Sequence, residues 1–205
     1  MEGNTKGHWE QVYETKSPVQ VSWTQAVPQT SLDLIQSLDL PKTARIIDIG
    51  GGDSTLVDHL LQAGYINLTV LDISAAALEK AKLRLGEQAS AVKWIVSDIT
   101  EFQPEESYDL WHDRATFHFL IEESQIETYA NLVAKAVTQY LVIGTFSENG
   151  PEKCSGLPIK QYSAASLQQQ ISTGFTKMQC IIEDHITPFK TTQKFLFCSF
   201  KKKLP

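Results

Sequence analysis

Residues 50–52, three consecutive glycines, constrain this chain more than any other feature. The run RIIDI at residues 45–49 is short and apolar, which is typical of a buried strand. Residues 56–61 place leucine and valine at helical spacing, and Gly64 follows as a stop signal. Glycines tolerate positive φ and leave the backbone bare for a ligand. The pattern therefore predicts the first strand-turn-helix unit of an open α/β sheet, where nucleotide-like ligands bind.

Two kinds of ligand compete for this turn. A dinucleotide site has the pattern G-x-G-x-x-G, and Gly50 and Gly52 supply its first two glycines, but Thr55 holds the third position. The other interpretation is a D-x-G-x-G turn that begins at Asp48. A purely structural turn is disfavoured, because each glycine costs roughly 0.5–1 kcal/mol of backbone entropy relative to alanine.

Length and composition indicate one ordinary globular domain of 205 residues, with 42% hydrophobic and 20% charged residues. The net charge of -6 argues against a large nucleic-acid surface. Three cysteines without a C-x-x-C pair predict reduced thiols. With no apolar run of about 18 residues and a polar N-terminus, we expect no membrane span, no secretory leader and a cytoplasmic protein.

The remaining periodicity predicts strands and helices in alternation, which gives a parallel sheet with helices on both faces. The last two strands are joined by too short a connection for a parallel crossover, so we expect them to pair antiparallel. The expected strands are residues 45–49, 67–71, 92–96, 108–113, 140–146, 177–186 and 194–201, and the expected helices include residues 7–14, 31–38, 75–85, 122–137 and 164–171.

From about Trp9 to Lys202 the chain resembles the class I S-adenosylmethionine-dependent methyltransferases, through the D-x-G-x-G turn and the order of its elements. The resemblance implies a three-layer α-β-α sandwich with a mostly parallel seven-stranded sheet, a C-terminal antiparallel hairpin, and S-adenosyl-L-methionine as cofactor. Residues 137–139 depart from the Pro-Gly-Gly that relatives often carry there. The Asn/Asp-Pro-Pro-Tyr signature of nucleic-acid methylators is also absent, and residues 113–116, Asp-Arg-Ala-Thr, stand in its place.

Ligands in such sheets bind at the carboxyl ends of the strands. Asp72, at the end of the second strand, is placed to accept hydrogen bonds from ribose hydroxyls. The resemblance implies that Asp98, after the third strand, meets the adenine amino group and that the Ile99 backbone N–H meets a ring nitrogen. The expected cofactor-binding residues are Trp23, Asp48, Gly50, Gly51, Gly52, Asp72, Ile73, Asp98, Ile99 and Asp113.

The fourth strand supplies the candidates for catalysis. Asp113 is expected to orient the cofactor or to act as a base. Because side chains alternate along a strand, His112 should face the other way. Arg114 is either a salt-bridge partner or a clamp on an anionic substrate group. His118 is either a buried core histidine or a base near neutral pH.

Two segments are expected to cover the site. Residues 1–30 carry aromatic side chains and are interpreted as a lid, and the alternative is that residues 7–14 form a helix that only packs the N-terminus onto the sheet. Trp23 is the better candidate for a pocket residue. Residues 147–162 form a long loop after the fifth strand, and loops of that length are usually functional. Cys154 in this loop is a candidate substrate-binding residue, or a structural thiol.

We expect a methyltransferase that acts on a nucleophilic N, S or O of a small molecule, as a monomer or homodimer. The open alternatives are a protein lysine methyltransferase and a non-catalytic S-adenosylmethionine-binding regulator. The five histidines are scattered and no pair has metal-ligand spacing, so no metal site is expected. Nucleic acid and membranes are not expected as partners.

Overall fold

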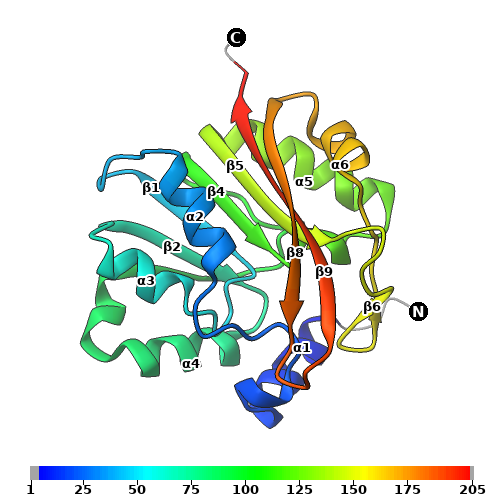
Figure 1. Cartoon of the computed structure of the whole chain (residues 1–205). Helices are drawn as coiled ribbons and strands as arrows, with labels where there is room; N and C mark the ends of the chain where they lie inside the picture. Colours follow the sequence, from blue (N-terminus) through cyan, green and yellow to red (C-terminus); the bar gives the residue numbers. More distant parts are fainter. Residues whose placement is uncertain (1–4, 204–205) are drawn as a thin grey trace.

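The computed structural model describes residues 5–203, which form a seven-stranded sheet in the order β3-β2-β1-β4-β5-β9-β8 (Figure 1). The four residues of the expected lid before Thr5 lie outside the described residues. The strands are β1 (Arg45–Ile49), β2 (Asn67–Asp72), β3 (Val92–Val96), β4 (Tyr108–Arg114), β5 (Val137–Phe146), β8 (Phe175–Ile186) and β9 (Thr192–Lys202).

The first five strands of the sheet are parallel, and the last two are not. Strand β1 pairs with β2 on one side and with β4 on the other, and β5 continues the parallel set beyond β4. Strand β9 runs antiparallel to β5, and β8 runs antiparallel to β9. This confirms the expected mixed α/β sandwich with a C-terminal antiparallel hairpin.

Helices cover both faces of the sheet and bury two separate apolar cores (Figure 1). One face holds α2 (Gln29–Ser37), α3 (Leu56–Gln62) and α4 (Ala75–Leu85), and the other holds α5 (Glu123–Ala136) and α6 (Ala164–Ile171). The Ser74 and Ser163 side chains cap α4 and α6, each by accepting a backbone N–H of the first turn. Within residues 5–203 no helix has both the length and the apolar character that a membrane span requires.

Helix α1 (Thr5–Thr15) lies across the carboxyl ends of the strands (Figure 1), and the Glu10 carboxylate binds it to the N-terminus of α4. Glu10 accepts hydrogen bonds from the Ser74 hydroxyl at 2.8 Å and from the backbone N–H groups of Ala75 and Ala76 at 2.9 and 3.0 Å. Burial raises the pKa of Glu10, but these hydrogen bonds outweigh burial and leave the pKa below its usual value. A carboxylate at a helix N-terminus is also favoured by the helix dipole.

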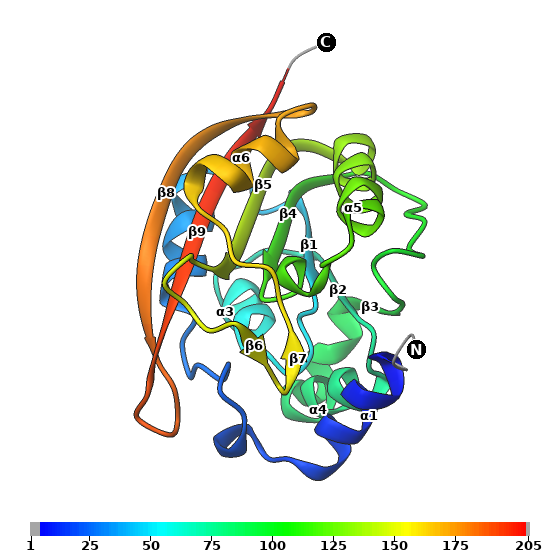
Figure 2. The same ribbon diagram turned by 90° about the vertical axis from the view of Figure 1, so that its right-hand side faces the viewer.

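The loop of residues 147–162 contains two very short strands, β6 (Lys153–Cys154) and β7 (Leu157–Pro158), which pair antiparallel. Figure 2 shows this hairpin beside α1. A hydrogen bond of 3.1 Å between His8 Nε2 and Ser155 Oγ joins the two segments. The N-terminal helix and the loop after β5 are therefore in contact over the carboxyl edge of the sheet.

The cysteines correct one expectation. Cys180 and Cys198 face each other across β8 and β9, with Cα atoms 4.1 Å apart, and they form a disulfide. Cys154 alone is a free, buried thiol among the described residues. The prediction of three reduced thiols is thus wrong for two of them, because it compared spacings along the sequence and did not consider which residues the hairpin places opposite each other.

We expect Glu10→Ala to release α1 from the sheet edge. Losing a capping side chain costs about 1 kcal/mol, so the backbone N–H groups of residues 5–15 should exchange with deuterium roughly fivefold faster if α1 opens locally. Hydrogen-exchange mass spectrometry measures this. The control is Glu14→Ala, because Glu14 is an exposed residue of the same helix. Equal exchange rates in the two variants would show that Glu10 does not hold α1 in place.

Candidate functional site

The turn between β1 and α3 leaves no room for side chains. Gly50 and Gly52 have positive φ values of 62° and 46°, a conformation that L-residues rarely adopt. A Cβ atom on Gly50 would overlap the Thr116 side chain, and one on Gly52 would lie 2.8 Å from the Tyr13 hydroxyl. The turn therefore needs glycine both for its backbone angles and for the close approach of β4 and α1.

A first cavity, of about 140 Å³, lies at the carboxyl ends of β2 and β3, and we call it the strand-end cavity. Helix α1 forms one wall of it through Trp9 and Tyr13. Its lining also includes Gly50, Leu71, Asp72, Ile73, Ser97, Asp98, Ile99, Thr100, Ala115, Thr116, Phe119, Leu120 and Gln125. The structure thus brings five of the expected cofactor-binding residues together here: Gly50, Asp72, Ile73, Asp98 and Ile99.

Asp72 is the buried carboxylate of this cavity. Its Oδ1 accepts the Ser74 backbone N–H at 2.8 Å. Burial raises the pKa of Asp72 to about 7, although hydrogen bonds from the Ser74 and Gly52 backbone lower it in part. A carboxylate in this state gains from any ligand that donates hydrogen bonds to it.

Asp98 is held in a tight turn after β3. Its Oδ1 accepts the backbone N–H of Thr100 at 2.8 Å and the Thr100 hydroxyl at 2.7 Å. These two bonds fix the carboxylate at the rim of the strand-end cavity and present the following residue, Ile99, to the same cavity. A flat ring lying there would meet one polar edge and one apolar wall.

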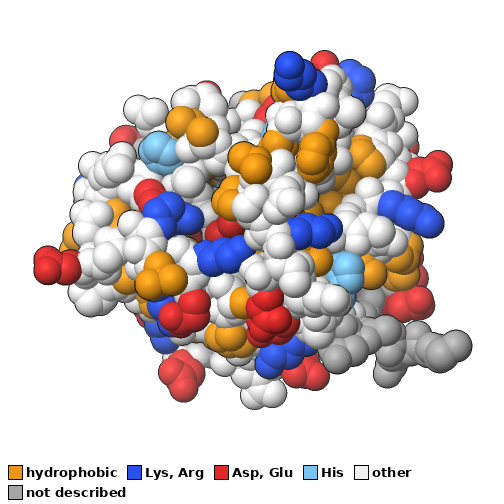
Figure 3. Space-filling view, turned by 90° about the horizontal axis from the view of Figure 1, so that it is seen from below, with side chains coloured by type: hydrophobic (Ala, Val, Ile, Leu, Met, Phe, Trp, Pro, Cys, Tyr) orange, Lys and Arg blue, Asp and Glu red, His pale blue; other side chains and the backbone are white. Residues whose placement is uncertain are grey.

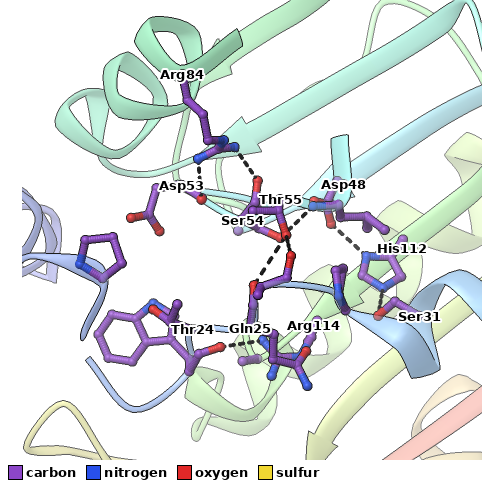
Figure 4. Close-up of a pocket in the computed structure, with 18 of the residues that line it drawn as sticks. Thr24, Gln25, Ser31, Asp48, Asp53, Ser54, Thr55, Arg84, His112 and Arg114 are labelled. Atoms are coloured by element: carbon purple, nitrogen blue, oxygen red, sulfur yellow. Dashed lines mark hydrogen bonds and ion pairs between the residues drawn. The ribbon is translucent and has the colours of Figure 1, made fainter. Parts of the chain in front are cut away.

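A second cavity, of about 220 Å³, lies on the other side of the glycine turn, and we call it the arginine cavity. It is lined by Tyr13, Pro18, residues 23–26, Pro28, Ser31, Asp48, Gly50, Gly51, residues 53–56, Arg84, His112, Arg114, Ala115 and Cys154 (Figure 4). The two cavities share three lining residues: Tyr13, Gly50 and Ala115. They are therefore neighbouring compartments separated by a thin wall of side chains and backbone.

The wall itself is strained. Ala115, the first residue after β4, has a φ of 70°. A non-glycine residue in this left-handed region costs on the order of 1–3 kcal/mol and persists only where its surroundings hold it. Here its N–H donates to the Gly144 carbonyl at 2.8 Å. Strain of this kind is often found at functional sites.

A buried chain of three polar side chains crosses the arginine cavity (Figure 4). His112 Nδ1 lies 2.7 Å from Asp48 Oδ1, and His112 Nε2 lies 2.9 Å from Ser31 Oγ. All three residues are almost completely buried. With Nδ1 protonated, the imidazole donates to the carboxylate and accepts the serine hydroxyl, which is the arrangement of a proton relay. Neither His112 nor Ser31 is among the site residues expected from the sequence, although strand alternation places His112 on the face opposite to Asp113.

Arg114 reaches the same cavity from the end of β4 (Figure 4). Its Nη1 donates to the Trp23 carbonyl at 2.9 Å, and its guanidinium carbon lies 5.1 Å from the centre of the Phe195 ring. Burial lowers the pKa of Arg114 to about 10, so the side chain stays charged at neutral pH. Trp23, expected at the cofactor, lines this cavity and not the strand-end cavity.

Asp113 and His118 line neither cavity. Asp113 is fully buried on the α5 side of the sheet, where it accepts the Tyr129 hydroxyl at 2.7 Å and the backbone N–H groups of Thr116 and Phe117. These bonds anchor the segment after β4 and leave the carboxylate little freedom to act as a base. The expected contact of Asp113 with the cofactor stays a prediction, and in this structure the carboxylate lies outside both cavities.

His118 is buried with its ring stacked on Phe146 at 4.6 Å between ring centres. Burial lowers the pKa of His118 to about 3, so it is a neutral and weakly basic group at physiological pH. Cys154 does line the arginine cavity, but burial raises the pKa of its thiol to about 12, so it is not a thiolate.

The wider surroundings add two observations. Among residues 5–203 no group of three or more His, Cys, Asp or Glu side chains is arranged to hold a metal ion. Figure 3 looks at the molecule from below, the side on which α1 lies in Figure 1, and shows positive and negative side chains mixed over that face. Mixed charge of this kind gives little attraction for a polyanion.

Comparison with known proteins gives a domain match over part of the sequence and a shared fold over nearly the whole chain. A family model described as a methyltransferase domain matches residues 46–139. The malonyl-[acyl-carrier protein] O-methyltransferase of Anoxybacillus flavithermus is 39% identical over 82 residues, which cover 39% of this chain and 30% of that protein. The chain therefore aligns with less than a third of that relative's length.

Two solved structures share the fold over almost the whole chain. One was determined in a study of the conversion of a disulfide bond into a thioacetal group during echinomycin biosynthesis; it has a TM-score of 0.79 and 19% identity, and covers 97% of this chain and 93% of its own. The other, the N-methyltransferase NodS of Bradyrhizobium japonicum in complex with S-adenosyl-L-homocysteine, has a TM-score of 0.74 and 17% identity, and covers 98% and 100%. The chain thus carries a methyltransferase-domain match over residues 46–139 and shares the fold of S-adenosylmethionine-dependent methyltransferases over nearly its whole length.

Proposed function

We propose that the protein is an S-adenosyl-L-methionine-dependent methyltransferase whose acceptor is a small molecule held in the arginine cavity. The observation that carries this proposal is the pair of cavities that meet at Gly50 and Ala115. One compartment suits a nucleoside, and its neighbour contains polar side chains able to hold an acceptor and move a proton. A methyl donor and its acceptor need such adjoining sites, because the reacting atoms must lie about 3–3.5 Å apart.

The residues of the strand-end cavity fit the cofactor. Asp72 offers a buried acceptor for ribose hydroxyls, Asp98 and Ile99 offer a polar edge and a backbone N–H for the base, and the glycine turn leaves space beside bare backbone. When bound, the cofactor supplies a methyl group on a sulfonium sulfur. The protein contributes binding, orientation and exclusion of water.

We favour a small acceptor over a protein lysine because the cavity is covered. Residues of the N-terminal segment, among them Trp23 and Pro28, form one side of it, and Cys154 of the loop after β5 forms another. The described part of the N-terminal lid, residues 5–30, and the loop of residues 147–162 are thus proposed to close both compartments. The relatives named above act on different atoms, so the methylated atom is left as N, S or O.

Proton transfer is assigned to His112 in place of Asp113 and His118. A proton released by an amine, thiol or hydroxyl acceptor passes to Ser31 Oγ while the serine proton passes to His112 Nε2. Asp48, at 2.7 Å, holds the imidazole in the required tautomer and stabilises the imidazolium. A general base of this kind contributes about 10²–10⁴-fold to a rate.

The direct test uses S-adenosylmethionine labelled in its methyl group and a cell lysate divided by size. We expect label to move into the small-molecule fraction in the presence of the protein. Label in protein lysines would overturn the small-molecule proposal, and tight cofactor binding with no transfer to any fraction would favour a non-catalytic regulator.

Binding of S-adenosylhomocysteine should weaken as pH falls from 8 to 6. The Asp72 carboxylate has a pKa near 7 in the free protein, so the ionised form that accepts ribose hydroxyls falls from about nine-tenths to about one-tenth of molecules, and affinity falls about tenfold. Calorimetric titration at both pH values measures this. Asp72→Asn should bind more weakly at pH 8 and lose the pH dependence; an unchanged dependence in that variant would assign it to another group.

Ser31→Ala and His112→Gln test the proton relay. We expect each variant to lose about 10²-fold in turnover on the fraction that wild-type protein methylates, with S-adenosylhomocysteine affinity changed less than about threefold, since neither residue lines the strand-end cavity. Asp98→Asn is the matched control, and it should lower cofactor affinity more than turnover at saturation. Full turnover in both relay variants would contradict the assignment.

A further inference from the structure

The arginine cavity is lined by two arginines that differ in how many of their guanidinium nitrogens make hydrogen bonds. Arg84 uses its whole guanidinium on the protein, donating to the Asp58 carboxylate from Nε and Nη2 and to the carbonyls of Asp53 and Ser54 from Nη1 and Nη2. Arg114 uses only Nη1, on the Trp23 carbonyl. Its Nε and Nη2 atoms are buried and have no hydrogen-bond partner.

The two unused donors of Arg114 form one edge of the guanidinium. Nε–H and Nη2–H point in parallel along that edge, which is the side-on face that binds a carboxylate through two hydrogen bonds. The Trp23 carbonyl on Nη1 and the Phe195 ring, whose centre lies 5.1 Å from the guanidinium carbon, hold the group in place. The edge is therefore held in place before any ligand arrives, which reduces the entropy that a ligand must lose on binding.

No carboxylate of the protein occupies this edge. Glu183 lies near enough to influence Arg114, but its Oε1 accepts the Gln25 amide at 2.9 Å and its Oε2 has no hydrogen-bond partner. Asp48 is engaged by His112. Within the described residues, 5–203, no ion pair involves Arg114. Two buried unpaired N–H groups on a charged side chain cost several kcal/mol unless a ligand satisfies them.

We propose that the acceptor is a carboxylic acid whose carboxylate binds the Nε/Nη2 edge of Arg114, which places its nucleophilic atom toward Ser31 and the wall at Ala115. The proposal rests on the proposed function, because it names the class of acceptor for that same cavity. The apolar side chains that line the same cavity, among them Trp23, Pro28 and Leu56, suit the body of such an acid. A dry cavity of about 150 Å³ holds benzene, so about 220 Å³ is enough for a benzoate-sized molecule.

The test uses benzoate as a probe and benzamide as its neutral isostere, with the protein saturated by S-adenosylhomocysteine. Saturation-transfer NMR gives the dissociation constants for wild type, Arg114→Lys, Arg114→Gln and Arg45→Gln. Arg45 is a partly exposed arginine at the opposite end of β1 and serves as the matched control. Charge-assisted hydrogen bonds contribute about 1.5–3 kcal/mol, so Arg114→Gln should weaken benzoate at least about tenfold.

We further expect wild type to bind benzamide at least about tenfold more weakly than benzoate. The benzoate affinity of Arg114→Lys should lie between those of wild type and Arg114→Gln, because lysine keeps the charge and loses the parallel donors. Arg45→Gln should behave as wild type. Three results would overturn the carboxylate assignment and leave the methyltransferase proposal standing. These are equal benzoate affinity in wild type and Arg114→Gln, equal affinity of wild type for benzoate and benzamide, and no benzoate binding to the wild-type complex with S-adenosylhomocysteine. Failure of S-adenosylhomocysteine itself to bind wild type would overturn the proposed function.

Discussion

The close approach of four elements at the glycine turn is the constraint on which the rest of the structure depends. A Cβ atom on Gly51 would lie 2.6 Å from Val70 of β2 and 2.8 Å from the Asp48 carboxylate. The neighbouring glycines are blocked by Thr116 after β4 and by Tyr13 of α1. Because the backbone itself fills this position, the sheet, the N-terminal helix and the segment after β4 meet there, and the space left over divides into two cavities.

Two buried aspartates at adjacent strand ends show how environment separates their roles. Asp48 has a side-chain hydrogen-bond partner in His112, and its carboxylate serves to position the imidazole. Asp72 lacks such a partner, and burial raises its pKa to about 7, so it is ready to receive a ligand that donates hydrogen bonds. This difference suits Asp48 to the proposed proton transfer on one side of the turn and Asp72 to the proposed cofactor recognition on the other.

Much of the fold could be predicted from the sequence, because its signals are local. The helix caps at Ser74 and Ser163 follow from the side-chain chemistry next to each helix. The succession of strands and helices along the chain follows from apolar periodicity. The strand-end cavity could be predicted for the same reason, since parallel strands end at one edge and their last residues must gather there.

The arginine cavity could not be predicted from the sequence, because contacts between residues far apart along the chain form it. Asp113 was expected at the cofactor, but the Tyr129 hydroxyl of α5 donates a hydrogen bond to its carboxylate on the opposite face of the sheet. Ser31 and His112 are 81 residues apart and become partners only when α2 packs over β4. The pairing of Cys180 with Cys198 depends in the same way on the register of the hairpin.

A crystal structure of the protein grown with S-adenosylhomocysteine tests the central claim most directly. The account predicts the adenosine in the strand-end cavity, with ribose hydroxyls donating to Asp72, and the thioether sulfur at the wall formed by Gly50 and Ala115, facing the arginine cavity. Adenosine bound elsewhere, or a sulfur directed away from His112 and Arg114, would contradict the claim that these two cavities form a single methyl-transfer site.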